Sequence, residues 1–406
     1  MIHVIEEANR CLQCKKPMCM TGCPISTPIP TMIKMFKEGD VKDAGAMLFE
    51  NNPLSIVCSL VCDHQKQCEG HCVLSRKGEG VHISSIENYI SNACLDNVAI
   101  ECQKPNGKMV AVIGAGPAGI TIAIEMRKKG YDVTIFDSRD KIGGVLQYGI
   151  PDFRLPKTIL ERYKKKLISL GIKIRPNTTI GGALVIDDLF RDGYKAIFIG
   201  TGVWRPKKLG IIGESLGNVH FAIDFLANPS SYDLGHDVAI IGAGNTAMDV
   251  ARTILRSGDH KVTIYARRRI DASEEEREYA LLDGVKIEVG MGIQRITPDG
   301  PVFRKNQLDS NGNIIGNDGV DIPVHADSTI IAISQGPKSK LVDTTEGLKP
   351  SANGLLLTND KGETTRPGIF AAGDVVLGAK TVVEAVSYAK KVAKSMDEYI
   401  AGLDSK

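Results

Sequence analysis

Eight of the ten cysteines fall into two groups near the start of the 406-residue chain. The first group has the spacing C-x2-C-x4-C-x3-C-P and contains Cys11, Cys14, Cys19 and Cys23. The second has the spacing C-x3-C-x5-C-x3-C and contains Cys58, Cys62, Cys68 and Cys72. No cysteine follows Cys102, so the chemistry of these thiols belongs to an N-terminal module.

Three kinds of site could use such cysteines: an iron–sulfur site, a zinc site or disulfide bonds. Clustered cysteines in a chain without a secretory pattern are more often metal ligands than disulfides. Structural zinc prefers two paired C-x2-C knuckles, and only Cys11 and Cys14 have that spacing. The first group resembles the ferredoxin run C-x2-C-x2-C-x3-C-P with a longer middle gap, so iron–sulfur is favoured.

The ferredoxin pattern also predicts that the first group serves two clusters. In two-cluster ferredoxins the last cysteine of such a run ligates the other cluster. Three closely spaced thiolates can surround one cubane while the fourth points away. Cys94 and Cys102 lack such spacing and are interpreted as ordinary helix or linker thiols.

The segments around the cysteines read as short helices. Residues Pro30 to Pro53 have apolar positions at helical spacing, interrupted at Gly39-Asp40, which predicts two helices. After Cys72, Ser84 can cap a helix, and Glu87 follows three positions later as in a capping box. On the residues alone, that structural role is favoured for Glu87.

From residue 109 the pattern becomes α/β. The strand MVAVI leads into G-x-G-x-x-G and a helical stretch, and the next strand ends at Asp137. In this context the glycines permit a tight turn, and the helix N-terminus binds a pyrophosphate. Asp137 stands where a carboxylate accepts hydrogen bonds from ribose hydroxyls. The nucleotide-binding candidates in the turn are Gly114, Gly116, Pro117, Ala118 and Gly119.

The same pattern recurs after the strand DVAII. Its candidates are Gly242, Gly244, Asn245, Thr246 and Ala247. The following strand, KVTIY, ends in Ala266 and three arginines instead of an acid. Because a carboxylate would repel a 2′-phosphate and arginines would pair with it, the first fold suits FAD or NAD and the second suits NADP(H).

Two further segments complete a flavoprotein pattern. Ala196 to Gly202 is a strand with a glycine-rich end, and Gly368 to Asp374 is a strand followed by a carboxylate and a helix beginning near Thr381. Their candidates for FAD are Gly200, Thr201, Gly202, Gly373, Asp374, Thr381 and Val382. Because FAD-type sequence returns after the NADP unit, the second domain is expected to be inserted into the first.

The expected fold class is therefore α/β, with two Rossmann-like domains preceded by an α-helical iron–sulfur domain. We expect the helical domain at residues 1–105, a discontinuous FAD domain at 106–206 and 335–406, and the NADP(H) domain at 207–334. A net charge of +2 gives no sign of a nucleic-acid partner, and no apolar run suits a membrane span. The N-terminus has no apolar signal region, so a cytoplasmic location is expected.

Together these motifs resemble the glutamate synthase small-subunit-like flavoproteins. That family includes the NADPH-side half of dihydropyrimidine dehydrogenase and the large subunit of NADH-dependent ferredoxin:NADP oxidoreductase. The resemblance covers nearly the whole chain. It is most specific in both cysteine groups, in GGVLQYGIPDFRLPK (Gly143 to Lys157), in GAGNTAMDVAR (Gly242 to Arg252) and in GIFAAGDV (Gly368 to Val375).

The resemblance implies a division of ligands between two [4Fe–4S] clusters. One cluster would be held by Cys11, Cys14, Cys19 and Cys72, and the other by Cys23, Cys62, Cys68 and Glu87. Glu87 thereby gains a ligand role in place of the capping role, although the two need not exclude each other. Cys58 matches a family cysteine that is not a ligand.

The resemblance also implies contacts of Leu146 and Arg154 with FAD, and of Arg267 and Arg268 with the 2′-phosphate. Gly144, in the same stretch as Leu146, is a further cofactor-binding candidate. Two positions depart from the family pattern. Asp137 replaces the more usual glutamate, and Ser334, which is expected beside the nicotinamide, stands where glycine is common.

The expected function is that of an electron-input subunit. NADPH would give a hydride to FAD, and the clusters would carry single electrons to a partner subunit, such as a glutamate synthase-like large subunit or a ferredoxin- or NADH-linked flavoprotein. Hydride transfer needs no general acid or base, so no catalytic side chain is nominated. The chain ends at Lys406 without a domain for substrate chemistry, which is expected on another polypeptide.

Three other functions compete with this one. The nearest is the flavin subunit of an electron-bifurcating transhydrogenase that couples NAD(H), NADP(H) and ferredoxin. A disulfide reductase would need a C-x2-C in the FAD or NADP domain, and no cysteine follows Cys102. A zinc-bearing assembly subunit with vestigial nucleotide folds is disfavoured by the intact glycine motifs.

Overall fold

The computed structural model describes residues 3–403, which divide into two compact units. The first unit consists of the chain up to Leu146, of Asp152–Val203 and of the chain from Pro337 onward. The second consists of Gln147–Pro151 and Trp204–Gly336. The second unit thus interrupts the first along the chain.

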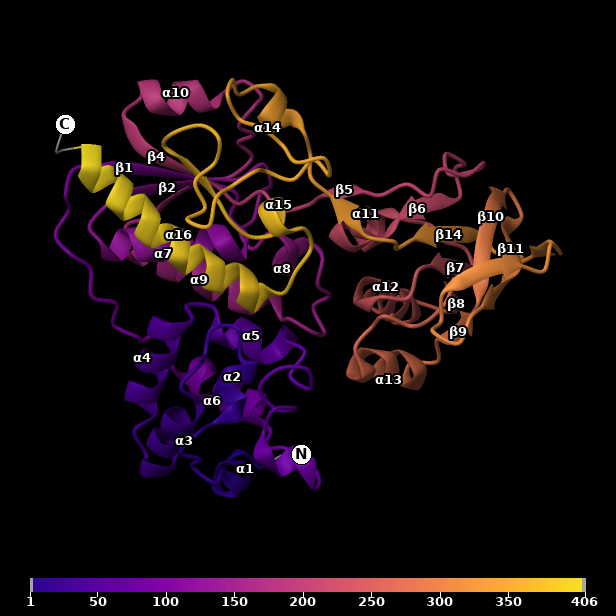
Figure 1. Ribbon diagram of the computed structural model, residues 1–406, viewed down its shortest axis with the longest axis horizontal. Coiled ribbons are helices and arrows are strands. Elements are labelled where there is room, and N and C mark those ends of the chain that lie inside the picture. Colours follow the sequence, from indigo (N-terminus) through magenta and orange to yellow (C-terminus); the bar gives the residue numbers. More distant parts are fainter. Residues whose placement is uncertain (1–2, 404–406) are drawn as a thin grey trace. The chain divides into compact units, whose positions relative to one another are not determined.

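The N-terminal part of the first unit is helical (Figure 1). Its elements are α1 (Val4–Arg10), α2 (Met18–Gly22), α3 (Ile29–Glu38), α4 (Val41–Asn51), α5 (Ser55–Val61), the 3-10 turn η1 (Val73–Arg76) and α6 (Ile83–Cys94). The predicted break between two helices is confirmed, because Gly39 ends α3 with a φ of 89°, which favours glycine. Met32, Ile33, Leu48 and Ile90 are fully buried between these helices.

The rest of the first unit is a parallel sheet with helices on both sides. The strand order is β16-β4-β1-β2-β3, and the strands are β1 (Met109–Ile113), β2 (Asp132–Phe136), β3 (Lys173–Arg175), β4 (Tyr194–Ile199) and β16 (Ile369–Ala371). In Figure 1, α7 (Pro117–Lys128), α9 (Lys157–Ser169) and α16 (Val382–Leu403) lie on one side, and α10 (Ile186–Arg191) lies on the other. β1 and β4 are buried over most of their length, as central strands of a covered parallel sheet should be.

The remaining short helices of the first unit follow glycine-rich turns or precede the last strand. They are α8 (Val145–Tyr148), α14 (Lys340–Asp343) and α15 (Asp374–Leu377). α8 ends in residues that group with the second unit.

The second unit contains another parallel sheet, with strand order β6-β14-β7-β8-β9. Its strands are β6 (Val219–Phe221), β7 (Asp237–Ile241), β8 (Lys261–Ala266), β9 (Lys286–Val289) and β14 (Ser328–Ile331). The helices are α11 (Ala222–Ala227), the 3-10 turn η2 (Pro229–Ser231), α12 (Asn245–Leu255) and α13 (Glu274–Leu282). A pair of short strands, β5 (Arg205–Pro206) and β15 (Gln335–Gly336), joins the two ends of this unit.

An antiparallel sheet that the sequence analysis did not anticipate is part of the second unit. Its strands are β10 (Met291–Thr297), β11 (Gly300–Leu308), β12 (Ile314–Asn317) and β13 (Ile322–Pro323). Tyr265 at the end of β8 stacks on Phe303 of β11, with ring centroids 4.4 Å apart. This contact fixes the antiparallel sheet to the parallel one at the strand that precedes the three arginines.

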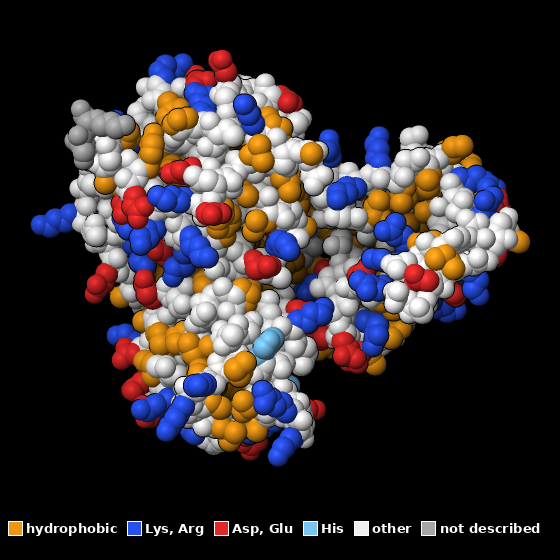
Figure 2. Space-filling model, viewed as in Figure 1, with side chains coloured by type: hydrophobic (Ala, Val, Ile, Leu, Met, Phe, Trp, Pro, Cys, Tyr) orange, Lys and Arg blue, Asp and Glu red, His pale blue; other side chains and the backbone are white. Residues whose placement is uncertain are grey.

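The surface carries both signs of charge. Figure 2 shows lysine and arginine side chains interspersed with aspartate and glutamate over the visible face, in keeping with the net charge of +2. Among the described residues, no helix is both long enough and apolar enough to cross a membrane.

Candidate functional site

The first set of expected ligands surrounds one cavity in the helical part. Cys11, Cys14, Cys19 and Cys72 all line it, and its empty space is about 390 Å³ including the open mouth. The other walls are apolar, from residues such as Ile33 of α3 and Ile83 of α6. Four soft donors around an apolar hollow fit an iron–sulfur cluster, whose sulfur-rich faces need no hydrogen-bonding wall on every side.

Burial keeps the thiol of Cys19 protonated in the absence of a metal. Burial, with smaller contributions from the nearby Cys72 and Cys11, raises the pKa of Cys19 to about 11. The Nε2 amide group of Gln13 lies 3.5 Å from the Sγ of Cys11 and donates to it. Among residues 3–403, no three His, Cys, Asp or Glu side chains gather tightly enough to hold a single metal ion.

The second set of expected ligands also lies together. A hydrogen bond with Cys58 raises the pKa of Cys62, and burial, Glu87 and Cys68 add to that effect. The pKa of Cys68 is raised by burial first, and then by Glu87, Glu69 and Cys23. Burial, together with Glu69, raises the pKa of Glu87 to about 8. Three thiols and a carboxyl that repel one another's charge form a donor set suited to a cationic group.

The capping-box interpretation of Ser84 and Glu87 is wrong. Helix α6 begins at Ile83 with His82 as its N-cap, so Ser84 lies inside the helix. The backbone N–H and the hydroxyl of Ser84 both donate to Oε1 of Glu69, at 2.8 and 2.7 Å. Glu87 is only 8% exposed and points into the interior among the cysteines.

Glu69 is a functional candidate that sequence reasoning missed. It is 6% exposed, it neighbours Cys68 in the sequence, and it holds the start of α6, the helix that carries Glu87. In the sequence, Glu69 directly follows Cys68 and looks like an acidic residue of an exposed loop. Nothing in the sequence indicates that it is buried.

The second set packs against the flavin-type fold of the same unit. The hydroxyl of Ser387 on α16 donates to the carbonyl oxygen of Pro24, next to Cys23, at 3.1 Å. Tyr163 of α9 is 1% exposed, and its hydroxyl donates to the carbonyl oxygen of Pro53 at 2.7 Å. These bonds fix the helical part to α16 and α9, on one side of the sheet.

The first glycine turn forms a cradle that side chains would fill. A β-carbon on Gly114, whose φ is 101°, would lie 2.6 Å from the carbonyl oxygen of Gly200. A β-carbon on Gly119 would lie 1.9 Å from the oxygen of Gly114, and one on Gly144 would lie 2.9 Å from the α-carbon of Gly116. The turn therefore requires glycine at these positions. It leads into α7, which begins at Pro117 and is followed by the buried Ala118.

Asp137 follows β2 and is tied to this turn. Its Oδ2 accepts the N–H of Ala115 at 2.6 Å, and its Oδ1 accepts the N–H of Arg139 at 2.8 Å. Burial raises the pKa of Asp137, although both backbone hydrogen bonds oppose the shift. Each oxygen keeps a second lone pair, so the carboxylate can still accept ribose hydroxyls.

The other flavin candidates occupy the turns that follow β4 and β16 and the start of α16. Gly202 and Gly373 have φ angles of 67° and 78°, and Thr201 lies between the two glycines after β4. Burial raises the pKa of Asp374 to about 6. Thr381 forms a capping box before Val382, because its hydroxyl accepts the N–H of Glu384 at 3.3 Å and Oε2 of Glu384 accepts the backbone N–H of Thr381 at 3.0 Å.

Leu146 in α8 and Arg154 in the segment between α8 and α9 are the FAD candidates implied by the resemblance. Leu146 is fully buried, and its carbonyl oxygen accepts a hydrogen bond of 2.7 Å from Nζ of Lys157. Arg154 lies in the turn before α9.

The second glycine turn has the same construction. Gly242 has a φ of 117°, and a β-carbon there would lie 2.3 Å from the carbonyl oxygen of Ala332. Gly244 caps α12, which begins with Asn245 and Thr246 and buries Ala247 completely. The N-terminus of this helix of 11 residues can therefore receive a pyrophosphate.

The arginines after β8 differ in their partners. Arg269 forms an ion pair with Asp271 at 2.8 Å. Arg267 is exposed and Arg268 is half-buried, and neither forms an ion pair with another described residue. Ser334, the last nicotinamide-side candidate, has a φ of 106°, in the region that favours glycine.

Comparisons with known proteins agree with this architecture. Residues 108–391 match the family described as pyridine nucleotide-disulphide oxidoreductase, and residues 2–98 match dihydropyrimidine dehydrogenase domain II, 4Fe-4S cluster. The glutamate synthase [NADPH] small chain of Azospirillum brasilense is 33% identical over 97% of this chain and 88% of its own length.

A second sequence relative and a solved structure are also similar to this chain. The NAD-dependent dihydropyrimidine dehydrogenase subunit PreT of Salmonella typhimurium is 30% identical over 98% of this chain and 94% of its own. The structure of Mycobacterium tuberculosis FprA in complex with NADPH has a TM-score of 0.63 at 18% identity, covering 74% of this chain and 86% of that one. At that identity the likeness concerns the fold alone.

The matched family accounts for both nucleotide folds, and the iron–sulfur match accounts for the helical part with its two cysteine sets. The chain therefore belongs to the pyridine nucleotide-disulphide oxidoreductase family and is an NAD(P)H-dependent flavin and 4Fe-4S oxidoreductase similar to the glutamate synthase small chain.

Proposed function

We propose that this protein takes electrons from NADPH and passes them singly, through FAD and two [4Fe–4S] clusters, to a partner subunit of the glutamate synthase type. The observation that carries the proposal is the presence of two separate donor sets in the same compact unit as the flavin-type fold. A chain built only to reduce a small molecule at a flavin has no need of either set.

The two donor sets support two clusters. The first would be held by Cys11, Cys14, Cys19 and Cys72, which share one cavity. The second would be held by Cys23, Cys62, Cys68 and Glu87, which lie close enough that Cys23 and Glu87 act electrostatically on Cys68, and Glu87 and Cys68 act on Cys62. A carboxylate as fourth ligand adds a harder donor to three soft ones, which distinguishes the second cluster chemically from the first.

The packing of the two sets supports an order of electron transfer. Cys23 is followed by Pro24, which is bonded to α16 of the flavin-type fold. The first set lies around a cavity with an open mouth, beside the exposed Leu12 and Met18. We therefore propose the order flavin, second cluster, first cluster, partner, with the first cluster as the exit to the partner.

The chain's own residues bind and orient the cofactors, and none is proposed as an acid or base. When bound, FAD accepts two electrons from the nicotinamide and releases them one at a time to iron–sulfur clusters. The turns at Gly114 and Gly242 would hold the two pyrophosphates, and Asp137 and Asp374 would accept hydrogen bonds from the flavin nucleotide. Arg267 and Arg268 would select NADPH by pairing with its 2′-phosphate.

The proposal is tested on the full chain purified without oxygen. We expect about eight irons with matching acid-labile sulfide and one FAD per chain, and bleaching of the flavin and clusters by NADPH. Zinc in place of iron, with no flavin, would overturn the proposal.

The identity of the partner is a separate question. Isolation of the native complex should yield a subunit that carries the acceptor chemistry. A partner that binds NADH and ferredoxin would replace the glutamate synthase-type role with that of an electron-bifurcating transhydrogenase.

A further inference from the structure

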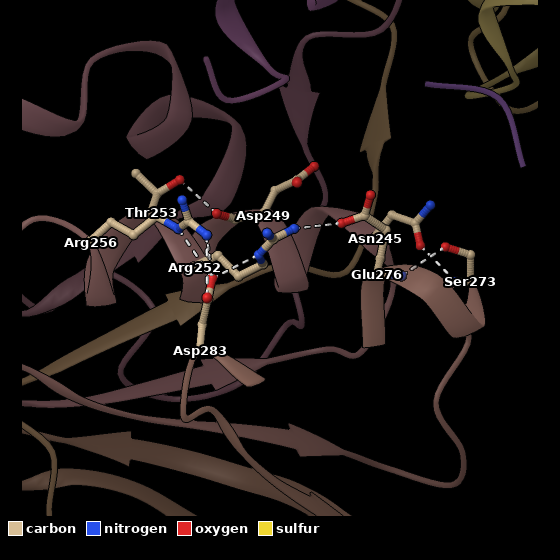
Figure 3. A network of polar contacts seen from close by, with 8 residues as sticks. All are labelled: Asn245, Asp249, Arg252, Thr253, Arg256, Ser273, Glu276 and Asp283. Atoms are coloured by element: carbon tan, nitrogen blue, oxygen red, sulfur yellow. Dashed lines mark hydrogen bonds and ion pairs between the residues drawn. The ribbon is translucent and has the colours of Figure 1, made fainter. Parts of the chain in front are cut away.

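The loop that contains the three arginines is anchored at its far end to the second glycine turn. This loop, Arg267–Ser273, connects β8 to α13. The carbonyl oxygen of Ala243 accepts the N–H groups of Asp271 at 2.9 Å and of Ala272 at 3.0 Å. The N–H of the next residue, Ser273, is accepted by Oδ1 of Asn245 at 2.8 Å (Figure 3). The end of the loop is therefore fixed relative to the pyrophosphate turn.

The anchoring continues through an altered capping box. Ser273 and Glu276 have the S-x-x-E spacing in which the glutamate ordinarily accepts the serine N–H. Here Asn245 accepts that N–H, and Oε2 of Glu276 instead lies 3.1 Å from Nη1 of Arg252, with both side chains buried (Figure 3). Arg252 also binds Asp283 at 3.0 Å, so α12 and α13 are joined at both ends of α13.

The near end of the loop is held from the antiparallel sheet. Nδ2 of Asn306, on β11, donates to the carbonyl oxygen of Arg267 at 2.7 Å. The backbone N–H of Asn306 is itself bound to the carbonyl oxygen of Gly290 at 2.7 Å. The side chain of Asn306 covers Gly292, where a β-carbon would lie 2.5 Å from its Oδ1. This contact fixes the direction in which the amide points.

We propose that Asn306 is a positioning residue that sets the preference for NADPH over NADH by holding the backbone of Arg267. The inference rests on the proposed role of Arg267 and Arg268 at the 2′-phosphate. A guanidinium pairs with phosphate in two parallel hydrogen bonds, so its effect depends on direction as well as on charge. NADH has no 2′-phosphate and does not use these arginines, so movement of Arg267 affects NADPH alone.

The experiment compares Asn306→Ala with Asn218→Ala in the full holoprotein. Asn218 is a matched control, because its Nδ2 also donates to a backbone carbonyl, that of Pro298 at 3.0 Å, at an exposed site in the same unit. The probes are adenosine 2′,5′-bisphosphate and adenosine 5′-monophosphate, whose binding is measured by calorimetry. NADPH oxidation with an artificial one-electron acceptor supplies kcat and KM.

We expect Asn306→Ala to weaken the bisphosphate about five- to tenfold, the worth of one hydrogen bond, and to leave the monophosphate within about twofold. KM for NADPH should rise by the same factor at an unchanged kcat. Asn218→Ala should change neither ligand. Gly292→Ala, which displaces the Asn306 amide without removing it, should reproduce the selective loss.

Equal weakening of both probes by Asn306→Ala, or no weakening of either, would overturn the inference. Its failure is distinguishable from failure of the proposed function. If the unaltered protein binds the two probes equally, the NADPH assignment and this inference both fall. If it prefers the bisphosphate, and loses that preference in Arg267→Ala with Arg268→Ala but keeps it in Asn306→Ala, only the inference falls.

Discussion

The hydroxyl of Ser387 lies 3.1 Å from the carbonyl oxygen of Pro24 and donates a hydrogen bond to it. The two residues are separated by 363 positions, and they join the residue after Cys23 to the helix expected to face the flavin. Cys14, by contrast, lines the cavity of the first set. Two cysteines nine positions apart therefore belong to different environments.

This division predicts that Cys14→Ser and Cys23→Ser remove different clusters. Each variant should lose about four irons and one of two electron paramagnetic resonance signals, because one thiolate is missing from one cubane. Cys94→Ser is the control, since the Sγ of Cys94 donates to the carbonyl oxygen of Val41 away from both sets. Loss of the same signal in both variants would contradict the division.

The arginines after β8 should discriminate between the nicotinamide cofactors. Arg267→Ala together with Arg268→Ala removes two charge-assisted contacts and should weaken NADPH about 100-fold while NADH changes by less than about threefold. Arg269→Ala serves as the matched control, because Arg269 is already paired with Asp271. Stopped-flow reduction of the flavin over a range of cofactor concentrations measures both affinities. Equal weakening of NADPH and NADH would refute the assignment.

Ser334 should be a point of backbone strain. Its φ of 106° suits glycine, and its carbonyl oxygen accepts the N–H of Lys207 at 3.1 Å, which holds it there. A side chain in this region costs about 1–3 kcal/mol, and the freer unfolded chain of a glycine variant offsets part of the gain. Ser334→Gly should therefore raise the free energy of unfolding by about 1 kcal/mol.

Denaturant unfolding of the full chain measures this difference. Ser334→Ala is the control, because it removes the hydroxyl and keeps the β-carbon. A glycine variant less stable than the alanine variant would mean that the strain is absent.

Asp374 should make the stability of the flavin-free protein depend on pH. Burial raises the pKa of its carboxyl to about 6, so the folded state favours the neutral form. Stability is then greatest below the unfolded pKa of about 4 and falls as the pH rises to about 6, where the buried group ionises. Asp374→Asn should remove this loss and stabilise the protein by about 1–2 kcal/mol at pH 7.5.

The comparison requires unfolding curves of both proteins at pH 5 and pH 7.5. The advantage of Asp374→Asn should be smaller at the lower pH. An advantage of the same size at both values would show that the effect has another cause.

The parts of this protein that were predictable from its sequence depend on local signals. Gly39 ends a helix because it adopts a left-handed conformation, and Gly114 and Gly242 occur in strand–turn–helix patterns that few other structures produce. The cysteine spacing likewise predicts metal ligation without any knowledge of the fold. Each of these signals lies within some twenty residues of sequence.

The parts that were not predictable depend on contacts between distant segments. Ser84 and Glu87 have the spacing of a capping box, but Glu69, from a preceding turn, occupies the Ser84 N–H and hydroxyl. From the sequence, Asn306 is an ordinary polar residue. Only the structure shows that β11 lies beside the loop at Arg267 and that Asn306 binds it. No spacing rule identifies such partners.

The bonds from α16 to the helical part also bear on the order in which the protein matures. Besides the Ser387 contact, Nζ of Lys390 donates to the carbonyl oxygens of Glu50 and Asn51 at 2.6 and 2.9 Å. Because a ribosome synthesises the chain from its N-terminus, the segments beside Cys23 cannot gain these contacts until residue 390 has been made. The helical part, although it is made first, therefore completes its packing against α16 only after nearly the whole chain has been synthesised.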